Sequence, residues 1–232
     1  MFSRDFKAWA REALRGHWWT AVAVCFIGGL LAGGIDMVSA VIQQPSEVEV
    51  FGMLDLAAND AWPMMVTVTV VSLLVALIIG GAVTLGVALY FTNIVAYRPS
   101  KFSDLFARFG IWHKGVWMSL VMSFFVFLWS LLFIIPGIIA VYRYAMVPYL
   151  IAEFPDLSVM DAMRESKRLM KGNKWRLFCL GFSFIGWVIL VCLTFGIGFF
   201  WLEPYMQAAN AAFYLDVTGR SGLRYPQPER EL

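Results

Sequence analysis

The sequence predicts an all-α integral membrane protein with six transmembrane helices in three hairpins, each hairpin preceded by a cytoplasmic amphipathic helix. Hydrophobic residues make up 60% of the 232 residues and charged residues only 15%, whereas soluble proteins have roughly 45–50% and about 25%. The positive charges are gathered into short regions between long apolar runs. A soluble domain could not cover such a core with so few charges, but side chains that face lipid need no polar coat.

The distribution of charge predicts the topology. Every Lys and Arg except Arg143 lies in one of four regions: the N-terminal segment, residues 98–114, residues 164–176 and the C-terminal tail. Loops rich in Lys and Arg stay in the cytoplasm during membrane insertion. An even number of spans must therefore separate consecutive basic regions. We expect a multi-pass protein of the cell membrane with both termini in the cytoplasm.

The first hairpin is predicted from two apolar runs, 20–42 and 64–96, that flank an acidic segment, 43–63, without Lys or Arg. A cleaved signal peptide is the competing interpretation of the first run, because Val38-Ser39-Ala40 resembles a small-residue cleavage site. The run is longer than the typical signal-peptide core of about 7–15 residues, which favours an uncleaved anchor.

The second and third hairpins are predicted from apolar runs that are too long for one span of about 20 residues. Residues 115–153 form one such run, and Pro136-Gly137 supplies its predicted turn. Residues 177–216 form the other, with Gly196 and Gly198 near the midpoint. The chain is thus one membrane domain, whose predicted parts are three hairpin units and a cytoplasmic tail: about 1–97, 98–154, 155–216 and 217–232.

A similar cytoplasmic segment precedes each hairpin. In each, a serine that can cap a helix (Ser3, Ser103 or Ser158) precedes apolar residues at helical spacing, and tryptophan follows. The apolar sets are Phe6, Trp9, Ala10, Ala13 and Leu14; Leu105, Phe106 and Phe109; and Val159, Met163 and Met170. Such helices either lie in the membrane interface or pack on neighbouring protein. The recurrence suggests a chain built from a repeated hairpin unit.

Two charges inside predicted spans are the main candidate site. Arg143 follows Gly137 by six residues and Glu203 follows Gly198 by five, so both lie roughly 8–9 Å from the outer turns at about 1.5 Å per residue. An unpaired charge there costs on the order of 2.5–3.5 kcal/mol on insertion scales. We expect Arg143 and Glu203 to form an intramembrane ion pair. The pair can serve as a structural tie or as a substrate or proton site; alternatively, the two side chains extend to the interface.

The third basic segment predicts contacts with anionic lipid headgroups, to which each nearby Lys or Arg adds about 1 kcal/mol. Its residues are Arg164, Lys167, Arg168, Lys171, Lys174, Trp175 and Arg176. The simpler alternative is that these charges only hold the loop in the cytoplasm.

Small residues at a spacing of four predict close helix packing, either within the bundle or between two copies. These residues are Gly29, Gly33, Ala208 and Ala212.

No pattern in the sequence predicts catalysis, a cofactor or a metal site. The cysteines Cys25, Cys179 and Cys192 lie in apolar runs and form no CxxC motif. The histidines form no HExxH motif, and no phosphate-binding loop or nucleophile elbow is present. We therefore expect no enzyme. The basic loops are explained by topology, so nucleic acid is not an expected partner.

Several short motifs lie in the second and third predicted hairpin units. They are Leu128-Trp129, Ile135-Pro136-Gly137, Val147-Pro148-Tyr149, Pro155-Asp156-Leu157-Ser158, Lys171-Gly172, Phe184-Ile185-Gly186-Trp187, Gly196-Ile197-Gly198, Pro204-Tyr205 and Ala212-Phe213-Tyr214. Together they resemble a bacterial family of multi-pass membrane proteins that is classed as a domain of unknown function, family 975, which looks distantly similar to the membrane domain of glycerophosphodiester phosphodiesterases. The resemblance covers residues 100–216 well and the first hairpin more loosely, and it implies a six-helix membrane protein without an established activity. The phosphodiesterase activity is not carried over, because the sequence shows no phosphodiesterase catalytic domain.

Two functions remain open from the sequence. The first is a non-enzymatic membrane protein that acts through helix packing, anionic lipid headgroups, a membrane-protein partner or a second copy of itself. The second is a transporter or channel for a small solute or ion, with a polar site near Arg143 and Glu203. A continuous cavity that reaches both residues would favour the second.

Overall fold

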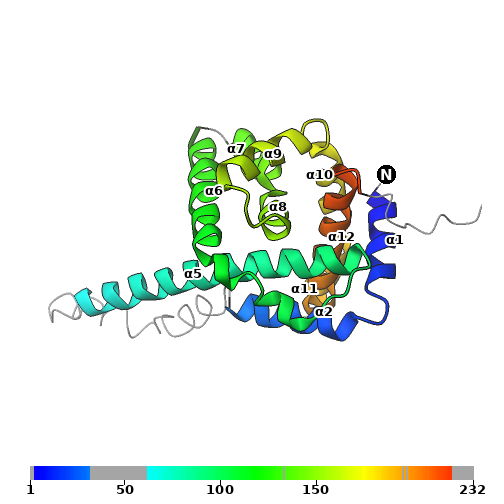
Figure 1. The fold of residues 1–232 in the computed structure, drawn as a ribbon, viewed down its shortest axis with the longest axis horizontal. Coiled ribbons are helices and arrows are strands. Elements are labelled where there is room, and N and C mark those ends of the chain that lie inside the picture. Colours follow the sequence, from blue (N-terminus) through cyan, green and yellow to red (C-terminus); the bar gives the residue numbers. More distant parts are fainter. Residues whose placement is uncertain (1–2, 32–61, 133, 195, 197, 221–232) are drawn as a thin grey trace, which may run out of the picture.

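The computed structural model describes residues 3–31, 62–132, 134–194, 196 and 198–220. Over these residues the chain forms helices joined by short turns, and it contains no strand (Figure 1). The prediction of an all-α protein is therefore confirmed for the described part. The outer end of the first predicted span, most of the acidic segment 43–63, and the end of the tail lie outside the described residues.

Helix α1 (Ser3–Ala13) packs on the rest of the protein through its apolar face. The side chains of Phe6 and Trp9 are buried. The Phe6 ring meets Phe213 of α12 with 5.4 Å between centroids, and Trp9 Nε1 donates a hydrogen bond to the Val95 carbonyl. The apolar face of this segment thus packs on neighbouring protein, and a position in the membrane interface stays a prediction. Gly16, with φ +87°, then turns the chain into α2 (Trp18–Gly29).

Helix α5 (Trp62–Val95) is the longest element and crosses the whole molecule in Figure 1. At 1.5 Å per residue it is about 51 Å long, so its first turns extend beyond the other helices. Helix α2 packs beside it, with Gly28 close to Val83 and Val87. The predicted second span, 64–96, is thus one continuous helix that begins two residues earlier than predicted.

The segment after α5 forms two short 3₁₀ helices, η2 (Phe102–Leu105) and η3 (Phe109–Ile111), rather than the predicted amphipathic α-helix. Two tertiary contacts explain the difference. The Leu105 backbone rests directly against Gly86 of α5, and the Asp104 carboxylate accepts hydrogen bonds from the Lys101 amide and from Asn93 of α5. These contacts replace the bonds that would continue a helix, so only Leu105 of the predicted apolar set is fully buried.

Helices α6 (Trp112–Leu132) and α7 (Ile134–Tyr144), which lie in the predicted second hairpin, pack against each other. The turn was predicted at Pro136-Gly137, but both residues belong to α7. Proline is tolerated there because the first amides of a helix have no intrahelical partner. The second arm continues after a break at Ala145-Met146 into α8 (Val147–Glu153).

Helix α9 (Val159–Leu169) begins as the sequence predicts. The Ser158 hydroxyl accepts a hydrogen bond from the Asp161 amide at 3.2 Å, and Gly172 adopts φ +85° after the helix ends. Val159, Met163 and Met170 are buried against neighbouring helices. This segment also packs on protein through its apolar face.

The segment predicted to form the third hairpin contains α10 (Lys174–Phe182), α11 (Ile185–Leu193) and α12 (Phe199–Val217). Its turn contains Gly196 at φ +84°, where the sequence predicts it. The first arm, however, is broken at Ser183-Phe184, because the Trp187 amide bonds to the Phe184 carbonyl instead of the Ser183 carbonyl. Helix α12 contacts α1, α2 and α5 and carries much of the buried core.

Three segments of the described part are long and apolar enough to cross a membrane: Leu77–Val95, Phe102–Trp129 and Lys174–Leu193. Large apolar side chains on α6 and α11 face outward without protein cover; Leu193, for example, is 73% exposed. Because a soluble surface would not leave such a band open, these features indicate association with a membrane. The predicted count of six spans goes beyond these three segments and stays a prediction.

Candidate functional site

Three polar side chains form a stripe along α12. Glu203, Gln207 and Asn210 are spaced four and three residues apart, which places them on one face of the helix. The small residues Ala208, Ala209 and Ala212 occupy other faces and are fully buried. Helix α12 therefore packs through its alanines and turns its polar stripe toward an open space.

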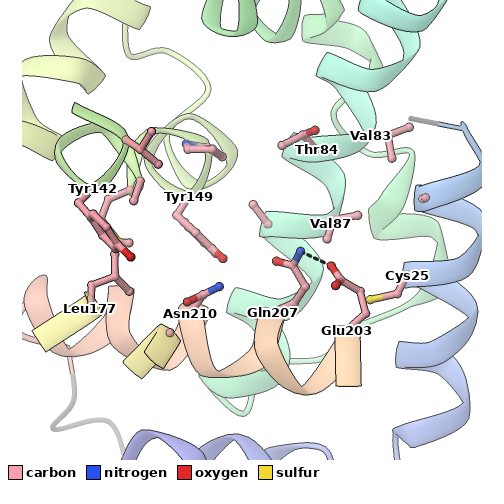
Figure 2. Close-up of a pocket in the computed structure, with 18 of the residues that line it drawn as sticks. Cys25, Val83, Thr84, Val87, Tyr142, Tyr149, Leu177, Glu203, Gln207 and Asn210 are labelled. Atoms are coloured by element: carbon pink, nitrogen blue, oxygen red, sulfur yellow. Dashed lines mark hydrogen bonds between the residues drawn. The ribbon is translucent and has the colours of Figure 1, made fainter. Parts of the chain in front are cut away.

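That space is a cavity of about 650 Å³ between α2, α5, α7, α8, α10 and α12 (Figure 2). Its volume lies in the range of roughly 300–1,000 Å³ that is typical of small-molecule sites. Most of its wall is apolar, and the polar groups come chiefly from α12. The residues that the argument uses are Cys25, Thr84, Tyr142, Tyr149, Glu203, Gln207 and Asn210.

The Glu203 carboxylate has one hydrogen-bond partner among the described residues: Gln207 Nε2 donates to its Oε1 at 2.9 Å. No Lys, Arg or His of the described part lies within 4.0 Å of it. Figure 2 shows Asn210 directed toward the same space, with the Cys25 sulfur beside Glu203. The cavity thus holds a carboxylate without a protein counter-ion, next to amide groups that can donate and accept hydrogen bonds.

Aromatic rings form the wall opposite the polar stripe. Tyr149 points toward Gln207 and Asn210 in Figure 2, and its ring stacks on Tyr214 with 5.3 Å between centroids. Tyr142 lines the same wall and meets Phe178 edge to face at 6.0 Å. Each of these two tyrosine rings packs against another aromatic ring, so the wall has a defined shape.

Arg143 does not join Glu203 in this site. Its Nε is buried without a hydrogen-bond partner in the described part, and its carbonyl accepts a hydrogen bond from Ser166 of α9. Tyr142, one residue earlier, lines the cavity, and a step of about 100° around the helix carries Arg143 to another face. Matching depth was the basis of the predicted ion pair, but depth does not determine the direction in which a side chain points.

The predicted headgroup residues separate into three groups. Arg176 is used inside the protein: it pairs with Asp216 at 2.6 Å and lies near the rings of Phe6 and Phe213. Arg164 and Arg168 form exposed pairs with Asp161 and Glu165 on their own helix. The remaining side chains reach the surface fully or in part: Lys167, Lys171, Lys174 and Trp175, the last 71% exposed.

The residues predicted to pack closely between helices differ in their surroundings. Ala208 and Ala212 are buried in the bundle. Gly29 has open space around its Cα, whereas its neighbour Gly28 contacts α5 so closely that an added Cβ would lie 3.1 Å from Val87 Cγ2. Gly33 lies outside the described residues. Gly29 therefore makes no close helix contact among the described residues, and packing between two copies through Gly29 and Gly33 stays a prediction.

Sequence reasoning missed Gln207, Asn210 and Glu153. The spacing of Gln207 and Asn210 from Glu203 was a readable signal for a polar stripe. Glu153, at the end of α8, accepts hydrogen bonds from Tyr214 and from two arginines, Arg98 and Arg220. Those partners are 55 to 67 residues away in the chain, so nothing local could have indicated the cluster. Within the described segments, no group of three His, Cys, Asp or Glu could hold a metal ion.

The fold and the cavity define a helical, membrane-associated protein with a polar site among its helices. Residues 132–221, which run from the last residue of α6 past α12, match the family described as "Protein of unknown function (DUF975)". This match supports the resemblance noted in the sequence for that part of the chain. No curated protein and no solved structure matches the chain. The distant similarity to the membrane domain of glycerophosphodiester phosphodiesterases stays a prediction.

Proposed function

We propose that this chain is a non-enzymatic, multi-pass membrane protein that binds and carries a small, positively charged solute in the cavity beside α12. The observation that carries the proposal is Glu203, a carboxylate that has no counter-ion among the described residues and lines a cavity of about 650 Å³. Ionisable groups inside membrane proteins are costly and usually functional. A cation with an apolar body would neutralise Glu203 and contact Tyr142 and Tyr149.

The proposed topology has six spans in three hairpins, with both termini in the cytoplasm of the cell. The placement of the basic residues supports this arrangement. The cavity wall combines α2 and α5, which we assign to the first hairpin, with helices that we assign to the second and third. Movement of one hairpin against the others would open such a site, as in carriers built from repeats.

Cys25 offers a direct test because it lies in the cavity wall beside Glu203. The protein would carry Cys179→Ser and Cys192→Ser, be placed in lipid nanodiscs, and be treated with aminoethyl and sulfonatoethyl methanethiosulfonate. These thiol reagents are similar in size and opposite in charge. We expect both to modify Cys25 and the cationic reagent to react faster.

Glu203→Gln should lower the ratio of the two rates about tenfold, since one nearby charge is worth at least 1.4 kcal/mol at a partly buried site. Glu12→Gln, which removes an exposed carboxylate on α1, is the matched control and should leave the ratio unchanged. Thr84→Trp should slow both reactions by filling the cavity, whereas Ser123→Trp on the outer face of α6 should not. A Cys25 that reacts with neither reagent, or a ratio insensitive to Glu203→Gln, would contradict the proposal.

Contact with anionic headgroups is a second candidate function, favoured by the exposure of Lys171, shortly before α10, and of Trp175 in its first turn, next to Lys174. Tryptophan next to lysine is typical of the membrane interface. We expect Lys167→Gln/Lys171→Gln to retain less phosphatidylglycerol than the wild type in native mass spectrometry. Arg4→Gln/Arg15→Gln, which removes two exposed charges on or next to α1, is the control, and equal losses in both variants would reject a specific role.

A further inference from the structure

We propose that a groove between α1, α11 and α12 binds one anionic membrane lipid, with its headgroup at Lys7 and Arg11 and its acyl chain along α11. This site is separate from the cavity at Glu203. The groove encloses about 370 Å³. Its charged end is formed by Lys7 and Arg11, and its apolar wall includes Trp18, Trp187, Leu190 and Trp201.

Lys7 is held at the groove by the break between α10 and α11. The break leaves the Ser183 carbonyl without its helical amide partner, and Lys7 Nζ donates to that carbonyl at 2.6 Å. The ammonium group also lies over the Phe184 ring, 4.3 Å from the centroid. An ammonium group has three donors, so a carbonyl and a ring leave it able to bind an anion as well.

Among the described residues that line the groove, Lys7 and Arg11 are positively charged and none is acidic. Lys7 and Arg11 are four residues apart on one helical face, where like charges repel. No Asp or Glu of the described ranges forms an ion pair with either residue. Burial, together with the charge of Arg11, lowers the pKa of Lys7. An anion placed between the two side chains would relieve this repulsion.

The apolar wall of the groove indicates the chemistry of the part of the ligand that lies beyond its anionic group. Trp187, Leu190 and Trp201 are each about half exposed. A hydrated inorganic anion would leave these side chains uncovered, whereas an acyl chain would cover them. Tryptophan beside basic residues is also the composition of a headgroup-level site. The charge and the wall together fit an anionic phospholipid of the surrounding bilayer.

The test measures lipid retention by native mass spectrometry, using protein purified with equal amounts of phosphatidylglycerol and phosphatidylcholine. We expect the wild type to retain phosphatidylglycerol preferentially and Lys7→Gln/Arg11→Gln to lose at least four-fifths of it. Arg4→Gln/Arg15→Gln removes the same charge from exposed positions on or next to the same helix and should retain wild-type amounts. A second variant, Leu190→Trp, fills the groove without changing its charge and should also reduce retention.

Equal retention of the two lipids by the wild type would overturn the proposal, and so would undiminished binding to Lys7→Gln/Arg11→Gln. An equal loss in Arg4→Gln/Arg15→Gln would mean that net charge alone attracts the lipid, which also rejects the site. An added arm with palmitate distinguishes a free carboxylate from a phospholipid: displacement of phosphatidylglycerol by equimolar palmitate would reject the phospholipid. Thermal unfolding of each variant measures whether the fold is retained. If Lys7→Gln/Arg11→Gln is unfolded, the retention of phosphatidylglycerol by Leu190→Trp tests the proposal in its place.

Discussion

Glu153 shows at the scale of one residue how a charge is accommodated at the edge of the apolar bundle. Its side chain is only 11% exposed, yet it accepts a hydrogen bond from Tyr214 at 2.7 Å and pairs with Arg98 and Arg220. Arg220 is also held over the Phe154 ring. The carboxylate therefore connects the ends of α5, α8 and α12. A buried acid with several partners is costly to remove because it leaves those partners without a counter-charge.

We expect Glu153→Gln to lower the free energy of unfolding by about 2 kcal/mol, as for the loss of hydrogen bonds to a charged group. Glu165→Gln is the matched control. It breaks a pair with Arg168, whose side chain is 76% exposed, and exposed pairs contribute about 0.2–1 kcal/mol. Unfolding of both variants in mixed detergent micelles, followed by circular dichroism, measures the difference. Equal losses would show that Glu153 is no more important than a surface pair.

Residue-scale predictions were reliable where they depended on close neighbours in the chain. Ser158 caps α9 through an amide three residues away, and Gly172 adopts the left-handed conformation that a helix stop requires. The contact between Arg143 and Glu203 required two helices to have a particular rotation, and the structure shows a different one. Side-chain direction around a helix is set by packing, which the positions of the charges do not encode.

Two glycines determine how closely α5 and α6 approach each other. A Cβ atom on Gly115 would lie 2.6 Å from the carbonyl carbon of Gly81, and the reverse substitution would clash equally. The two backbones are thus in direct contact. Contact of this kind is the usual role of small residues in membrane helices, because close approach increases van der Waals packing where the hydrophobic effect is absent.

We expect Gly115→Ala to destabilise the protein by about 1–3 kcal/mol, the usual cost of overpacking. Gly186 in α11 provides the control, because a Cβ there meets nothing within 4 Å. Gly186→Ala should be neutral or stabilising by up to about 1 kcal/mol, since alanine has the higher helix propensity. Denaturation in detergent micelles compares the two variants. A Gly115→Ala protein as stable as the wild type would mean that the helices do not touch at this point.

At the element scale, the apolar runs located the helices, while tertiary contacts set their limits. Pro136 was assigned to a turn, but it lies in the first turn of α7, where its missing amide has no effect on the hydrogen-bond ladder. The segment around Leu105 was predicted to be an α-helix, but contact with Gly86 leaves it as 3₁₀ turns. Both differences arise because local sequence signals permit more than one structure.

At the scale of the whole molecule, the predicted six-span topology can be tested by cysteine labelling. In a background without native cysteines, Lys171→Cys and Gln44→Cys would be probed with a membrane-impermeant maleimide in intact cells. We expect Gln44→Cys to be labelled from outside and Lys171→Cys only after permeabilisation, because basic segments stay in the cytoplasm. Ser100→Cys, in the loop after α5, should behave like Lys171→Cys. Labelling of Lys171→Cys in intact cells would contradict the six-span arrangement.

The sequence by itself determined that the described chain is helical and membrane-associated, because composition and the length of apolar runs reflect the solvent that the chain must meet. It also located the glycine turn near residue 196 and the cap at Ser158, which depend on neighbouring residues. Only the tertiary structure determined which distant residues come together in the cavity at Glu203, in the groove at Lys7 and in the cluster at Glu153. These sites join residues far apart in the chain, and their geometry follows from the rotation and crossing of helices, which packing selects after the helices have formed.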